Sequence, residues 1–156
     1  MANLAATYSN QGKWKEAEAL QTVVMEKMKH LLGEEHPNTI TSMANLACTY
    51  SNQGNWKEAE ALETLAMEKR KHLLGEEHPD TLTNMANLAA TYWCQGKWKA
   101  AEALEVVVME KRKNLLGEGH PATLRSMSNL ASTYKSQSKW KEAEALEMAM
   151  SKSNQA

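Results

Sequence analysis

The sequence repeats itself every 42 residues. The segment MANLA begins at Met1 and returns at Met43 and Met85, and the related segment MSNLA begins at Met127. Self-similarity at a period of roughly 20–50 residues indicates a solenoid or array, because one such unit cannot bury its apolar face without a neighbour. We therefore predict one domain over residues 1–156. Its predicted repeats, the last of them partial, are 1–42, 43–84, 85–126 and 127–156.

A glycine and a proline mark the boundary between successive repeats. The segment Gly75-Glu76-Glu77-His78-Pro79 has counterparts that begin at Gly33 and Gly117. Glycine suits the residue after the C-terminal end of a helix, and proline suits the first turn of the next one. Each of these segments therefore predicts the end of one helix and the start of another.

The first helix of the repeat follows Pro37. Its apolar residues have the i, i+3, i+4, i+7 spacing of one helix face. They are Met43, Leu46, Ala47 and Tyr50. Gly54 is predicted to end this helix, and the short turn before Trp56 predicts an antiparallel pair of helices.

The second helix is predicted to run from Trp56 to about Leu74. The core stripe predicted for this second helix consists of Trp56, Ala59, Leu62, Ala66 and Leu73. No part of the repeat alternates with the period of a strand, so the predicted fold class is all-α.

Composition excludes several classes of partner. The formal net charge is −1, and Lys and Glu alternate without forming a basic stripe, so neither nucleic acid nor a membrane surface is an expected partner. The longest apolar stretches are far shorter than a membrane span, and no secretory signal is present at the N-terminus. Cys48 and Cys94 occupy different positions in their repeats, which argues against a repeated disulfide framework. We expect a reducing, cytoplasmic setting.

Histidines and acidic residues gather at the repeat boundaries. His30 and His36 flank an acidic pair and recur in the second repeat, but the third repeat has Asn114 and Gly119 at two of these positions. Zinc needs three or four convergent ligands, so we favour a helix-capping role over a metal site. No phosphate loop and no nucleophile with a partnering base is present, so we predict neither a cofactor nor an enzyme.

The order Leu46-Ala47-x-x-Tyr50-x-x-x-Gly54-x-Trp56-x-x-Ala59 resembles the tetratricopeptide signature. The phrases LLGEEHP, NLA-x-TY and QGKWKEAEAL resemble the 42-residue variety in kinesin light chains and in NACHT or NB-ARC sensor arrays. The resemblance covers essentially the whole chain. It implies a right-handed superhelical solenoid whose first helices line a concave groove. It also implies a non-catalytic scaffold that binds a protein or an extended peptide.

The face opposite the core stripe of the first helix should line that groove. Counting 100° per residue, it consists of Thr41, Asn45, Cys48 and Asn52. This set is small and polar, which leaves room for an extended peptide. In peptide-binding tetratricopeptide domains an asparagine at the position of Asn45 commonly holds the peptide main chain, because a carboxamide both donates and accepts.

An asparagine recurs at this position in every repeat. The series is Asn3, Asn45, Asn87 and Asn129. The resemblance implies the peptide-holding role for all four. The alternative is that each asparagine bonds to a neighbouring helix and fixes the angle between repeats. Both roles would recur with the period, so the sequence leaves the choice open.

Trp93 interrupts the pattern, since the second repeat has Ser51 at its position. It lies off the core face, which makes it either an exposed anchor of the kind favoured at binding hot spots or a residue packed on the next first helix. With Arg125, Lys135 and Asn129 it would form a weakly basic, aromatic corner suited to an acidic peptide. The remaining tryptophans recur with the period and are predicted to be core: Trp14, Trp56, Trp98 and Trp140.

The two ends of the chain support a second function class. The first repeat begins within its first helix and lacks the His-Pro turn of the others, whereas 148–153 form a partly polar tail. An exposed apolar end favours end-to-end stacking or exchange of a hairpin between chains. The alternative to a binding scaffold is therefore a structural or self-assembly module that forms homo-oligomers.

Overall fold

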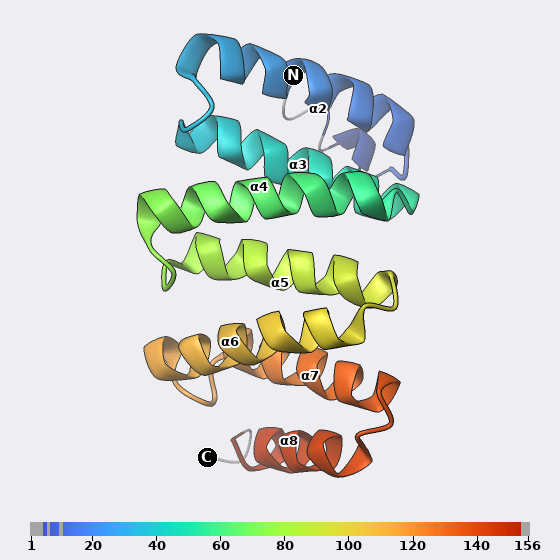
Figure 1. Ribbon diagram of the computed structural model, residues 1–156, viewed down its shortest axis with the longest axis vertical. Coiled ribbons are helices and arrows are strands. Elements are labelled where there is room, and N and C mark those ends of the chain that lie inside the picture. The colour runs from blue at the N-terminus through green and yellow to red at the C-terminus, as the bar shows by residue number, and fades with distance from the viewer. Residues whose placement is uncertain (1–4, 6, 10, 154–156) are drawn as a thin grey trace. The chain divides into compact units, whose positions relative to one another are not determined.

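The computed structural model describes residues 5, 7–9 and 11–153, which contain helices and turns but no strand (Figure 1). The fold is all-α, as the periodicity predicts. The helices with described bounds are α2 (Trp14–Leu32), α3 (Pro37–Gln53), α4 (Trp56–Leu74), α5 (Pro79–Cys94), α6 (Trp98–Leu116), α7 (Pro121–Ser136) and α8 (Trp140–Ser153). They fall into two compact units, Met1–Asn87 and Leu88–Ala156. The prediction of one domain over the whole chain stays a prediction.

The turn inside each helix pair depends on a left-handed residue. Gly54 has a φ of +80° and donates its amide to the Ser51 carbonyl at 3.1 Å. The next amide, of Asn55, donates to the Tyr50 carbonyl at 2.9 Å, so two carbonyls of the last turn of α3 are satisfied. This geometry confirms the predicted end of α3 and the short connection to α4.

The joint between repeats is capped by histidine. The Nδ1 atom of His36 accepts a hydrogen bond from the Asn38 amide at 3.1 Å, and Pro37 occupies the first position of α3. His78 and His120 accept from the amides of Asp80 and Ala122 at the same distance. A side-chain acceptor at this place satisfies one of the unpaired amides of a helix start. The capping role of His36 and His78 is confirmed.

In unit 1 the core lies where α3 packs between α2 and α4. Ile40, Met43 and Ala66 form its buried cluster, and Met25 and Ala44 pack against it. The close approach of the helices requires small side chains. Alanines that recur every 42 residues supply them and are almost fully buried: Ala17, Ala59, Ala101 and Ala143.

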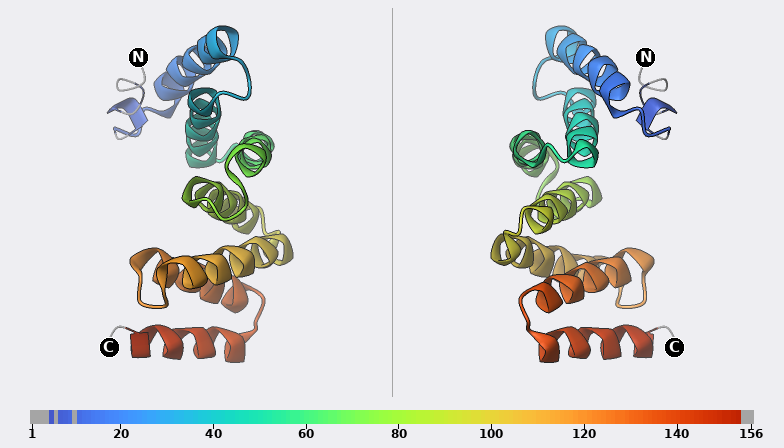
Figure 2. Two further views of the ribbon diagram at one scale, coloured as in Figure 1. Left: turned by 90° about the vertical axis from the view of Figure 1, so that its left-hand side faces the viewer. Right: turned by 90° about the vertical axis from the view of Figure 1, so that its right-hand side faces the viewer.

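In unit 2, α7 packs between α6 and α8 (Figure 2). Its buried face carries Met127, Leu130 and Ala131, which correspond in the repeat to Met43, Leu46 and Ala47 of unit 1. The two units therefore use the same core positions. All three unit 1 positions were predicted from the helical spacing, and all three are buried.

The prediction that every periodic tryptophan belongs to the core is wrong. Trp14 and Trp56 are half-buried, but Trp98 is 41% exposed and Trp140 is 62% exposed. Each of these tryptophans is the first residue of its helix, and none of the four is buried. Leu73 was also predicted to be core and is exposed, since it lies in the last turn of the long helix α4.

Ser138 occupies the left-handed turn position that other repeats fill with glycine. Its φ is +60°, and the corresponding Gly12, Gly54 and Gly96 also have positive φ. A non-glycine residue in this conformation costs about 1 kcal/mol or more. We expect Ser138→Gly to raise the free energy of unfolding by about 1 kcal/mol in urea titrations.

The matched control is Gly96→Ser, which should lower the free energy of unfolding by a similar amount. A Cβ added at Gly96 would meet no atom within 4 Å, so the cost would be purely conformational. Unchanged stability in both variants would show that these turns tolerate a side chain without strain.

Candidate functional site

The exposed face of α3 consists of the four residues predicted for the groove. They are Thr41, Asn45, Cys48 and Asn52, and all four are exposed. The Thr41 hydroxyl accepts a hydrogen bond from Nη2 of Arg70 at 3.0 Å. The same guanidinium donates to Oδ1 of Asn84 at 2.6 Å. Arg70 of α4 therefore connects α3 with the start of α5 at one end of this face.

The recurring asparagines do not share one environment. Asn45 and Asn129 are exposed, whereas Asn87 is half-buried and donates through Nδ2 to the Cys48 sulfur at 3.9 Å. Asn87 thus joins α5 to α3 in unit 1, as expected if the asparagine at this position bonds to a neighbouring helix. The exposed carboxamides of Asn45 and Asn129 fit the peptide-holding interpretation. Asn3 lies outside the described residues.

Trp93 is bonded to the next first helix and is also partly exposed. Its Nε1 donates to the Ser136 hydroxyl of α7 at 3.1 Å, and that hydroxyl donates in turn to the Ser132 carbonyl at 3.1 Å. The side chain nevertheless stays 43% exposed. The hydrogen bond fixes the indole against the next first helix and leaves part of the ring open to solvent.

The two predicted basic residues lie at opposite ends of α7. Arg125 is exposed near the start of α7. Burial lowers the pKa of Arg112, and the positive charge of Arg125 lowers it further. Lys135 lies near the end of the helix and forms an ion pair with Glu147 of α8. Ten residues of helix separate them by about 15 Å. Trp93 is bonded to Ser136, so it lies toward the end of α7 that carries Lys135 and away from Arg125.

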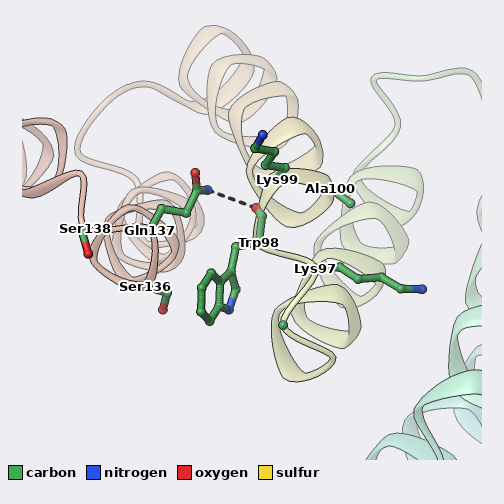
Figure 3. Close-up of a pocket in the computed structure, with 8 residues that line it drawn as sticks. Lys97, Trp98, Lys99, Ala100, Ser136, Gln137 and Ser138 are labelled. Atoms are coloured by element: carbon green, nitrogen blue, oxygen red, sulfur yellow. Dashed lines mark hydrogen bonds between the residues drawn. The ribbon is translucent and has the colours of Figure 1, made fainter.

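A hollow that the sequence did not predict lies beside Trp98 in unit 2 (Figure 3). Its volume is about 700 Å³, and residues 96–100 and 136–138 line it. Gln137 closes one side by donating through Nε2 to the Trp98 carbonyl at 3.2 Å. The indole was assigned to the core, so its exposed ring was missed. Its place at the first position of a helix was the signal that could have revealed it.

A carboxylate–amide pair ties neighbouring repeats together. In unit 2, Glu102 accepts from Nε2 of Gln137 at 2.7 Å and from Nζ of Lys139 at 2.7 and 2.9 Å. The Lys139 hydrogen bond is the main cause that lowers the pKa of Glu102. In unit 1, Glu18 accepts from Nε2 of Gln53 at 2.8 Å. The same two positions of the repeat therefore make the same bond in both units.

A carboxylate is also buried between α6 and α7. Glu105 is only 6% exposed, and its Oε2 has no hydrogen-bond partner among the described residues. Burial raises the pKa of Glu105, the charge of Glu102 raises it further, and the hydroxyl of Thr133 acts in the opposite direction. Sequence reasoning missed this residue because a glutamate in an amphipathic helix is ordinarily solvated.

The described residues contain no cluster of three or more His, Cys, Asp and Glu side chains placed to hold a metal ion. None of the helices in that part of the chain is both long and apolar enough to span a bilayer. Neither Cys48 nor Cys94 forms a disulfide, and both are exposed.

Comparisons with known proteins agree with this geometry. The sequence profile of the tetratricopeptide repeat matches residues 1–72 and 53–106, and a second tetratricopeptide repeat profile matches residues 123–155. A search of curated protein sequences found no match.

Solved structures with a similar fold agree with the tetratricopeptide profile matches. A putative kinesin light chain from Podosopora anserina with nearly identical repeats is 28% identical, with a TM-score of 0.85 over 98% of this chain and 72% of that one. A point variant of that protein, in a second crystal structure, is 22% identical, with a TM-score of 0.62 over 99% and 95%.

BtubC (BKLC) from P. vanneervenii is 22% identical, with a TM-score of 0.90 over 98% of this chain. The match spans 61% of the length of BtubC. These structures establish the solenoid of helix pairs, a fold that is typically non-catalytic and generally mediates protein–protein interactions. The profile matches extend over more than half of the sequence. The chain belongs to the tetratricopeptide repeat family.

Proposed function

We propose that this chain is a non-catalytic scaffold that binds an extended segment of another protein along the exposed faces of its first helices. The observation that carries the proposal is the exposed polar face of α3, where Asn45 and Asn52 present carboxamides to solvent. Small polar residues on a rigid helix pair leave space for a peptide and offer donors and acceptors to its main chain. The scaffold role of the family supports the same function.

In unit 2 the proposed peptide site is the exposed face of α7 together with Trp93. The part of the indole that remains open can contact an apolar side chain of the peptide, and its bond to Ser136 holds it in place before binding. Arg125 and Asn129 are exposed along the same helix. Lys135 is paired with Glu147 and would have to exchange that partner for a peptide carboxylate. The favoured partner is therefore an acidic peptide with one large apolar residue.

The test uses the tightest peptide selected from a random library displayed on phage. We expect the double variant Asn45→Leu with Asn87→Leu to weaken binding of that peptide by about 1–3 kcal/mol, the cost of leaving polar groups unpaired. Fluorescence anisotropy measures the affinity, and circular dichroism confirms that helicity is kept. The matched control is Asn114→Leu, the same change at an exposed position of α6.

The two single variants separate the roles of the asparagines. Asn45→Leu should weaken binding without altering the melting temperature, because Asn45 is exposed. Asn87→Leu should also lower stability slightly, because it removes the bond to the Cys48 sulfur. Affinity that stays unchanged in the double variant would refute the assignment of the peptide site to this face.

A further inference from the structure

Arg112 in unit 2 occupies the same position of the repeat as Arg70 in unit 1 and makes the equivalent contact. Nη1 of Arg70 donates to Oδ1 of Asn84, near the start of α5, at 2.6 Å. Nη1 of Arg112 donates to the Ser126 hydroxyl, near the start of α7, at 3.0 Å, and to the Ala122 carbonyl at 3.5 Å. Each guanidinium therefore connects a second helix of the fold to the start of the first helix that follows it.

The charges around these two arginines differ between the units. Ala122 corresponds to Asp80, whose carbonyl accepts from Nη1 of Arg70 at 3.4 Å, so unit 2 lacks the carboxylate that unit 1 carries there. Three residues further along the helix, Arg125 corresponds to Thr83. The arginine and these two positions therefore carry one charge of each sign in unit 1 and two positive charges in unit 2.

The two arginines of unit 2 lie close together without a counter-charge. Arg125 directly precedes Ser126, the residue whose hydroxyl accepts from Arg112. After burial, the positive charge of Arg125 is the next cause that lowers the pKa of Arg112. Among the described residues, no carboxylate forms an ion pair with either arginine, and Nη2 of Arg112 has no hydrogen-bond partner. Donors and positive charge are thus left over at the start of α7.

The exposure of Arg125 is a property of its position in the repeat. Thr41 and Thr83 occupy the same position of the earlier repeats and are also exposed, although further helices follow each of them. Arg112 is half-buried, and its bonds are to α7 inside unit 2. The surroundings of this arginine pair are therefore set by α6 and α7, and the exposed guanidinium is open to a ligand.

We propose that Arg112 and Arg125 together bind the phosphate of a phosphorylated serine or threonine in the partner segment. A phosphate monoester carries a charge of about −2 at neutral pH and three strong acceptor oxygens, so it matches two unpaired guanidiniums. A single carboxylate would neutralise only one of them. The inference deepens the proposed function and rests on it for the peptide that carries the phosphate, whereas the phosphate contact itself is made by the two arginines.

NMR titrations with a small probe, N-acetyl-O-phosphoserine methylamide, test the proposal without a peptide. At constant ionic strength we expect this probe to bind at least roughly tenfold more tightly than the equivalent capped aspartate, because two cations act on a doubly charged group. Arg125→Thr installs the residue that unit 1 has at this position and should weaken binding at least roughly tenfold. The matched control is Lys99→Thr, which removes an exposed cation elsewhere on α6 and should not change binding.

Two further variants change the counter-charge and keep Arg70 and Arg112. Ala122→Asp supplies in unit 2 the carboxylate that unit 1 has at Asp80, so it should weaken probe binding as much as loss of a cation does. The converse exchange in unit 1, Asp80→Ala with Thr83→Arg, should create an additional site for the probe. Circular dichroism shows whether each variant keeps its helices.

Binding that is unchanged in both Arg125→Thr and Ala122→Asp would overturn the proposal, and so would a capped aspartate that binds as tightly as the phosphoserine probe. Inorganic phosphate is the third ligand in these titrations. If it binds more tightly than the phosphoserine probe, the assignment to a phosphorylated side chain is wrong. The Asn45→Leu and Asn87→Leu variants test the peptide site with a peptide, so its failure and the failure of the phosphate site are measured independently.

Discussion

Replacing Ile40 with alanine should lower the free energy of unfolding by about 2–5 kcal/mol. Ile40 is 1% exposed and forms one buried cluster with Met43 and Ala66. Since α3 packs on both α2 and α4, the cavity would weaken two helix contacts at once. Urea titration followed by circular dichroism measures the change.

Two controls show whether the loss comes from the cavity. Ile40→Leu conserves volume, and the second repeat already has Leu82 buried at this position, so we expect a cost below about 1.5 kcal/mol. Leu31→Ala removes the same number of atoms from a side chain that is 74% exposed, and it should change stability by less than about 0.5 kcal/mol. A loss in Leu31→Ala equal to that in Ile40→Ala would contradict this explanation.

The helix boundaries could be predicted from the sequence because local chemistry sets them. Gly54 ends α3 and Pro37 begins it, as expected, since few residues other than glycine tolerate a positive φ and proline suits the first turn of a helix. The exposed face of α3 was also predictable, because the 100° step per residue places Asn45 opposite the buried Leu46 stripe.

The errors concern positions where tertiary packing overrides periodicity. Trp98 and Trp140 recur with the repeat, but recurrence does not distinguish a core position from the edge of the layer. The bond from Asn87 to Cys48 was also hidden, because only one repeat has a cysteine at that position. Asn87 and Cys48 lie 39 positions apart in the sequence, so no local rule gives this contact.

Glu105→Gln should stabilise the protein at neutral and higher pH by about 1–3 kcal/mol, because it removes the cost of burying a charged carboxylate whose Oε2 has no hydrogen-bond partner among the described residues. A neutral amide is less costly to bury than a carboxylate, and the first repeat itself has Gln21 at this position. Burial is the largest cause of the raised pKa of Glu105. The hydroxyl of Thr133 lowers this pKa, and the charge of Glu102 raises it.

The sign of the pH dependence follows from the raised pKa of Glu105. The folded state binds this proton more tightly than the unfolded state, so the penalty is complete above the folded pKa and absent below the unfolded one. The stability gained by Glu105→Gln should therefore shrink as the pH falls through the folded pKa, which urea titrations from about pH 8 to about pH 4 would follow. Glu110→Gln, at an exposed position of the same helix, should show no such trend. A gain that is the same at every pH would mean that the carboxylate charge of Glu105 does not oppose folding.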